Sequence, residues 1–99
     1  MHELVFHTAL EDRPWVSIDL LETRWLHGLE ILNRTDCCQE RAVPLVVEVA
    51  GEDGHYAEVA RRNETFAVWK PVFDNRRARY IRLWVDARTS FHLEEIRIP

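Results

Sequence analysis

The chain has 99 residues, 46% of them hydrophobic and ten of them aromatic, which is enough for one domain with a modest core and excludes a second domain. A formal charge of -4 argues against nucleic acid as a partner, because phosphate backbones are bound by a surplus of cationic side chains. Apolar runs stay well short of the ~20 residues that cross a bilayer, so membrane insertion is not expected.

Hydrophobic residues alternate with a period of two along most of the chain, which predicts strands and not helices. The alternating runs, in chain order, lie at residues 16–20, 29–31, 45–49, 56–59, 66–73 and 80–85. In the run at 80–85, Ile81, Leu83 and Val85 are expected to point inward. Turn-forming residues separate the runs at 51–54, 62–63, 74–75 and 86–88.

The final segment changes the parity of its hydrophobic positions. Phe91 and Leu93 share one parity and Ile96 and Ile98 share the other, so a bulge near Glu94 and Glu95 is needed to bury all four. Seven or so short strands at this spacing predict an antiparallel β-sandwich. The pattern alone does not choose between a jelly-roll and an immunoglobulin-like topology.

The loop at residues 33–41 places two guanidiniums, one carboxylate and two adjacent thiols behind an apolar run. The planar forks of Arg34 and Arg41 suit hydrogen bonding to vicinal oxygens, and an imidazole such as that of His7 can both donate and accept. Asp36 is close enough in sequence to neutralise and aim both arginines without touching a ligand. The alternative is a surface loop with ordinary ion pairs, each of which contributes little.

Cys37 and Cys38 are neighbours, and the Cα atoms of a trans peptide are only ~3.8 Å apart, closer than a standard disulfide prefers. A bond between them would close a strained ring, and strain of that kind often marks a functional site. Reduced thiols are a second possibility, which a cytosolic location would favour. A metal-binding pair or a redox dithiol is less favoured, because both usually need the cysteines separated or further ligands.

The spacing His-x26-Arg-x-Asp-x4-Arg, formed by His7, Arg34, Asp36 and Arg41, resembles the sugar-binding signature of the F-type lectins, the fucose-binding lectins. Pro14-Trp15 and the Ile-Asp-Leu-Leu run at 18–21 are similar to the family's PWW-x-VDL segment. The Leu-Glu-Glu-Ile-Arg-Ile run at 93–98 is similar to its closing L-x-E-V-x-V strand. The resemblance therefore covers nearly the whole chain.

The resemblance implies an all-β fold, a jelly-roll of the discoidin or galactose-binding type. Residues 1–99 would form a single carbohydrate-binding domain that lacks the family's usual N-terminal strand and calcium loop. His7, Arg34 and Arg41 would hold the axial 4-hydroxyl, a neighbouring hydroxyl and the ring oxygen of L-fucose. A bond between Cys37 and Cys38 would pack against the sugar ring as an apolar plate. Asp36 would neutralise and orient the two arginines without contacting the sugar.

No metal and no other cofactor is expected. Glu95 matches the acidic calcium ligand of the family's closing strand, but a single carboxylate cannot supply the six to eight oxygens that calcium takes. We therefore expect Glu95 at the surface or in a salt bridge.

The resemblance implies a lectin module and not an enzyme, with fucosylated or related glycans as partners. Single sites of this kind bind weakly, so a homo-oligomer or attachment to a larger protein is expected. The ligand class and the cysteine pair favour an extracellular location, although the first residues do not form a signal peptide. The alternative function is a discoidin-like interaction domain that does not bind sugar.

Other aromatic and imidazole side chains are assigned mostly to packing or to the surface. Trp15 suits either the core or the floor of a pocket. Trp25, Trp69 and Trp84 have no spacing that distinguishes a sugar platform from packing, so packing is the expectation. Four histidines have no metal-ligand spacing and are assigned surface or structural roles: His2, His27, His55 and His92.

Overall fold

Nine strands and one short 3-10 helix make up residues 6–99, the part of the chain that the computed structural model describes. The elements in chain order are β1 (Phe6–Asp12), β2 (Trp15–Gly28), β3 (Glu30–Leu32), η1 (Gln39–Ala42), β4 (Leu45–Ala50), β5 (Ala57–Arg62), β6 (Val68–Trp69), β7 (Val72–Val85), β8 (Arg88–Leu93) and β9 (Glu95–Arg97). No helix in this range is long and apolar enough to span a membrane.

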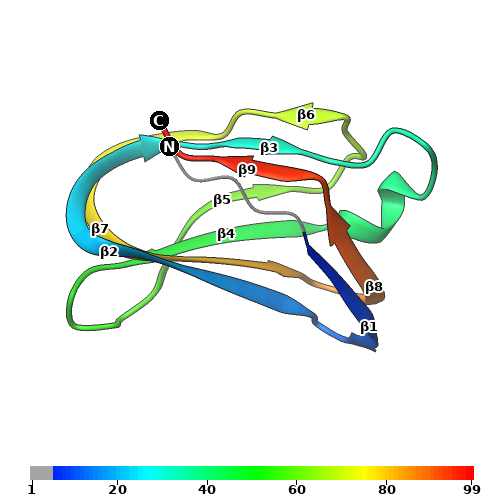
Figure 1. Ribbon diagram of the computed structural model, residues 1–99, viewed down its shortest axis with the longest axis horizontal. Coiled ribbons are helices and arrows are strands. Elements are labelled where there is room, and N and C mark those ends of the chain that lie inside the picture. Colours follow the sequence, from blue (N-terminus) through cyan, green and yellow to red (C-terminus); the bar gives the residue numbers. More distant parts are fainter. Residues whose placement is uncertain (1–5) are drawn as a thin grey trace.

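The strands form antiparallel sheets of four strands (β2-β7-β4-β5), three strands (β6-β3-β9) and two strands (β1-β8). In Figure 1, β3, β6 and β9 lie in one layer, β2, β7 and β4 lie in the other, and β1 and β8 stand at one end. The long strands β2 and β7 curve together toward the opposite layer, and their register shifts between Asp19 and Arg24. The predicted antiparallel β-sandwich is confirmed.

The core lies between the layers and follows the predicted alternation. Ile81, Leu83 and Val85 of β7 are fully buried, as expected, and pack in one cluster with residues of the opposite layer such as Ile31 and Ile96. Since side chains on a strand alternate between faces, the intervening positions of β7 point to the outside of the sandwich.

The four hydrophobic residues of the final segment, Phe91, Leu93, Ile96 and Ile98, are all buried, as predicted. The parity change does not come from a bulge within one strand. The strand is interrupted at Glu94. Before this residue β8 pairs with β1, and after it β9 pairs with β3 in a different sheet. Where the chain passes from one sheet to the other, Glu94 N donates a backbone hydrogen bond to Leu32 O at 2.9 Å.

Two local predictions are wrong. The turn at 74–75 does not exist, because these residues lie inside β7 (Val72–Val85), whose first half pairs with Arg24 to Gly28 of β2. The register of this pairing shifts between Leu26 and Gly28, so Asp74 and Asn75 lie at an irregularity of the strand pair and not in a turn. The strand at 66–73 is reduced to β6 (Val68–Trp69), followed by the start of β7 at Val72.

The four tryptophans differ in how far they are buried, and the packing prediction does not hold for all of them. Trp69 packs against Phe66 with 5.9 Å between ring centroids, and it contacts the core, as expected. Trp25 is 63% exposed, so the packing assignment is wrong for it. Trp15 is 60% exposed, which excludes the core alternative. Trp84 is half-buried on the outer face of β7.

Candidate functional site

The loop between β3 and β4 is closed by two amide side chains that the sequence analysis did not single out. The buried Asn33 accepts a hydrogen bond from Arg34 N (2.8 Å) and donates one from its Nδ2 to Gln39 O (3.2 Å). Gln39 in turn donates from Nε2 to Arg34 O (3.0 Å). These three bonds hold the two ends of the loop together and fix the backbone that carries Arg34.

Arg34 and Asp36 form a bidentate ion pair within this loop. Nε and Nη2 of Arg34 each donate to a carboxylate oxygen of Asp36 at 2.8 Å. The Arg34 side chain is only 19% exposed, whereas Asp36 faces solvent. Hydrogen bonding to Arg34 holds the pKa of Asp36 well below its ordinary value, and Asp36 raises the pKa of Arg34. Among the described residues Asp36 pairs with Arg34 and makes no ion pair with Arg41.

Replacing Asp36 with asparagine is expected to make the fold less sensitive to acid. Because the folded-state pKa of Asp36 is lowered, its contribution to stability is present above the unfolded-state pKa of about 4 and is lost as the pH falls below that value. The wild type should therefore lose more melting temperature than Asp36→Asn between pH 6 and pH 3, measured by circular dichroism. Equal losses in the two proteins would contradict the assignment.

Cys37 and Cys38 are joined by a disulfide, and no free cysteine remains. The interpretations as reduced thiols and as a metal pair are therefore wrong. Cys37 is exposed and Cys38 is half-buried. Cys38 has a φ of 65°, in the left-handed region that non-glycine residues seldom adopt, and it immediately precedes η1. The disulfide thus presents sulfur atoms at the surface between Arg34 and Arg41 in the chain.

Arg41 lies in η1, which is attached to β8. Its N–H donates to Cys38 O at 3.0 Å, and its carbonyl accepts from the Thr89 hydroxyl of β8, also at 3.0 Å. The Arg41 side chain is exposed, and within residues 6–99 its guanidinium makes no ion pair or side-chain hydrogen bond.

His7 lies on β1 and faces β8, where its register partner is His92. The two Nδ1 atoms are 3.3 Å apart, and the rings meet edge to face with centroids 5.4 Å apart. His7 Nε2 is 3.3 Å from the Ser90 hydroxyl. Since Ser90 already donates its hydroxyl hydrogen to Thr8 O (2.6 Å), it can only accept from His7. The contact fits the tautomer of His7 that carries its ring hydrogen on Nε2.

His92 was assigned a surface or structural role, and the structure places it beside the predicted site. Its Nε2 lies 3.3 Å from a carboxylate oxygen of Glu94, at ion-pair distance but without hydrogen-bond geometry. The charge of Glu94 in turn contributes to raising the pKa of Arg34. His92 and Glu94 therefore lie between the strand that carries His7 and the loop that carries Arg34.

The predicted site residues are distributed over three segments that adjoin β8 or its end. His7 is on β1, Arg34 and the disulfide are in the loop after β3, and Arg41 is on η1. In Figure 1 these segments lie at the same end of the molecule. In the part of the chain that the structure describes, no hydrogen bond or ion pair joins His7, Arg34 and Arg41 to one another.

Glu95 is salt-bridged, as predicted. Its carboxylate lies 2.9 Å from Arg97 Nη2, while Arg97 Nη1 donates to Glu30 at 2.7 Å. Hydrogen bonds to both carboxylates raise the pKa of Arg97. Arg97 therefore links β9 to Glu30 of β3, and Glu95 pairs with Arg97 from the same strand.

Comparison with known proteins gives a consistent result. The model of the NedA-like, galactose-binding domain, of F5/F8 type C, matches residues 4–83. The lectin domain of lectinolysin, solved with Lewis B antigen, is 27% identical, with 96% of this chain and 70% of that chain covered and a TM-score of 0.83. A fucose-binding module of Streptococcus pneumoniae is 26% identical, with 95% and 68% covered and a TM-score of 0.79.

A serum fucolectin of striped bass, Morone saxatilis, shares the fold, with a TM-score of 0.84 and 22% identity. The match covers 95% of this chain and 35% of the fucolectin chain. A search of curated proteins finds no match. The similarity to fucose-binding lectins, inferred from the spacing of His7, Arg34, Asp36 and Arg41, is confirmed by these matches.

Proposed function

Because this chain belongs to the family of NedA-like, galactose-binding domains of F5/F8 type C, we propose that it is a single non-catalytic module that binds terminal L-fucose or a similarly configured sugar. The observation that carries the proposal is the loop after β3. There a fixed Arg34–Asp36 pair, an exposed Arg41 and a surface disulfide occur together beside the strand pair that bears His7.

A neutral sugar offers hydroxyls that donate and accept, a ring oxygen that only accepts, and apolar C–H faces. The guanidinium of Arg34 has five N–H donors. Asp36 takes one from Nε and one from Nη2, so the remaining donors are on Nη1 and Nη2 and the plane of the fork is fixed. Arg34 can then bridge two vicinal sugar oxygens with little loss of side-chain entropy.

His7 and Arg41 supply the other donors. The contact of His7 Nε2–H with Ser90 is long at 3.3 Å, and a sugar hydroxyl would replace Ser90 as the acceptor. His92 Nδ1 would hold the opposite side of the ring by donating to His7 Nδ1. An epimer that misplaced one hydroxyl would leave a donor unpaired at a cost of ~1–3 kcal/mol, which gives the site its stereochemical preference.

The disulfide between Cys37 and Cys38 would supply the apolar plate for one C–H face of the sugar. Replacing both cysteines with serine, or reducing the disulfide, is expected to weaken binding of fucosylated glycans about 5- to 30-fold, since ~1–2 kcal/mol of apolar contact and loop rigidity would be lost. A glycan array, run with and without reductant, measures this loss.

The double serine variant is also the control, because the chain has only two cysteines. Reductant should weaken the wild type and leave the variant unchanged. If reductant has no effect on an oxidised wild type that binds fucose, the plate has no role. If no glycan on the array is bound, the interaction domain without sugar binding replaces the lectin as the function.

A single shallow site of this kind binds weakly, so functional binding would come from several copies. Repeated sites raise the apparent affinity through effective concentration and need no new contact within each site. Assembly into a homo-oligomer or attachment to a larger protein would supply the copies.

A further inference from the structure

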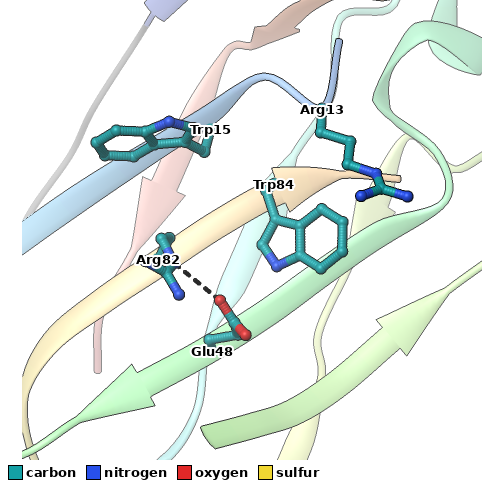
Figure 2. A pocket seen from close by; sticks show the side chains of 5 residues that line it. All are labelled: Arg13, Trp15, Glu48, Arg82 and Trp84. Atoms are coloured by element: carbon teal, nitrogen blue, oxygen red, sulfur yellow. Dashed lines mark hydrogen bonds and ion pairs between the residues drawn. The ribbon is translucent and has the colours of Figure 1, made fainter. Parts of the chain in front are cut away.

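A hollow of about 240 Å³ lies on the outer face of the four-stranded sheet, over β2, β7 and β4. Figure 2 shows the five side chains that line it: Arg13, Trp15, Glu48, Arg82 and Trp84. None of them belongs to the loop site. The sequence alone does not reveal this group, because its members meet only when β2, β7 and β4 are in register.

The register explains why these side chains share one face. Trp15 is directly opposite Trp84, and Arg82 is directly opposite Glu48. Residues of β7 that point the other way, such as Leu83, are fully buried in the core. The outer face therefore carries two neighbouring indoles above an ion pair.

The two indoles lie outside the hydrophobic core. Trp15 is 60% exposed, and Trp84 is half-buried next to it. Large aromatic side chains exposed together around a concave surface are typical of binding sites, since each exposes apolar area to water until a ligand covers it. The two rings give the hollow an apolar wall.

The charges at the hollow are paired. Nε of Arg82 donates to Glu48 at 2.8 Å, and the guanidinium of Arg82 also stacks over Tyr56, 4.0 Å from the ring centroid. Arg13 pairs with Asp86 at 3.3 Å. Both cations are therefore paired with a carboxylate, although Arg13 shares Asp86 with Arg61. The polar groups of the hollow remain able to donate from the guanidiniums and to accept at Glu48.

We propose that this hollow is a second carbohydrate site, which takes one neutral hexopyranose unit of a glycan. The apolar C–H face of the sugar would stack on Trp15 and Trp84, and its hydroxyls would bond to Glu48 and Arg82. The volume is below the ~300–1,000 Å³ of sites for drug-sized ligands, which suits one ring and not an oligosaccharide. This site does not depend on sugar binding at the loop.

The test is a titration of the ¹⁵N-labelled protein with methyl β-D-galactoside. NMR spectra recorded during the titration monitor the indole N–H signals of the tryptophans. The titration is run on the wild type and on Arg34→Ala, in which the loop site is impaired. In both proteins the Trp15 and Trp84 signals should shift and saturate. Trp15→Ala should abolish the saturable shift of Trp84, and Glu48→Gln should weaken it severalfold.

Trp25→Ala is the matched control, because Trp25 is equally exposed but does not line the hollow. It should leave the titration unchanged. The proposal is overturned if neither indole shifts with the galactoside, or if Trp84 still shifts fully in Trp15→Ala. The two proposals can fail separately. If the loop does not bind sugar, methyl α-L-fucoside does not bind, but the indole signals still shift with the galactoside.

Discussion

Replacing Arg34 with alanine is expected to weaken the binding of methyl α-L-fucoside about 10- to 150-fold. Hydrogen bonds from a charged donor contribute ~1.5–3 kcal/mol each, and the substitution removes the donors that Asp36 holds in place. It also leaves the Asp36 carboxylate without its cation at the site. Isothermal titration calorimetry on the purified proteins measures the change.

Arg61→Ala is the matched control for this prediction. Arg61 also forms ion pairs at the surface, with Glu58 at 3.0 Å and with Asp86 at 3.4 Å, and it lies on β5. Its loss removes the same charge without touching the loop after β3. Affinity should be unchanged in Arg61→Ala. If Arg34→Ala binds the fucoside as well as Arg61→Ala does, Arg34 is not part of the site.

Replacing Phe91 with alanine is expected to lower the free energy of unfolding by ~3–5 kcal/mol, the range for large-to-small changes of buried aromatic residues. Phe91 is fully buried and lies on β8 between Ser90 and His92, both of which contact His7. The variant should therefore also bind fucoside more weakly where it remains folded. Urea unfolding, followed by circular dichroism, gives the stability change.

Val72→Ala is the comparison for Phe91→Ala. Val72 is 80% exposed at the start of β7, so its truncation should change stability by no more than about 0.5 kcal/mol. A loss below ~1 kcal/mol in Phe91→Ala would mean that β8 is not packed as the structure has it.

The sequence predicts the core well where burial repeats with the period of a strand. Ile81, Leu83 and Val85 are buried as expected, because a period of two on one face is a local property of the chain. The parity change between Leu93 and Ile96 was also found, but its cause was not. Which sheet a strand joins depends on distant partners, and hydrophobic spacing does not encode them.

Local turn chemistry was misleading at Asp74 and Asn75 for the same reason. Both residues favour turns in isolation. In the fold they lie in β7, between Val72 and Arg76, which both pair with the distant end of β2, so the chain continues as a strand through them.

The candidate site divides in the same way. Arg34, Asp36 and the two cysteines lie within one short segment, so residue type and spacing single them out as candidates, whereas the bond between the cysteines was implied only by the family resemblance. His92 was missed because β1 was not predicted as a strand, and only the pairing of β1 with β8 brings His92 to His7. Asn33 gave no signal, since its contacts with Gln39 depend on the course of the loop.

The most direct test of the account is a crystal structure of the protein soaked with methyl α-L-fucoside. We predict one bound sugar with oxygens at hydrogen-bond distance, about 2.7–3.2 Å, from His7 Nε2, from Arg34 and from Arg41. One C–H face of this sugar should lie on the disulfide between Cys37 and Cys38. A fucoside bound elsewhere, or side chains of His7, Arg34 and Arg41 pointing to separate surfaces with no sugar between them, would contradict this prediction.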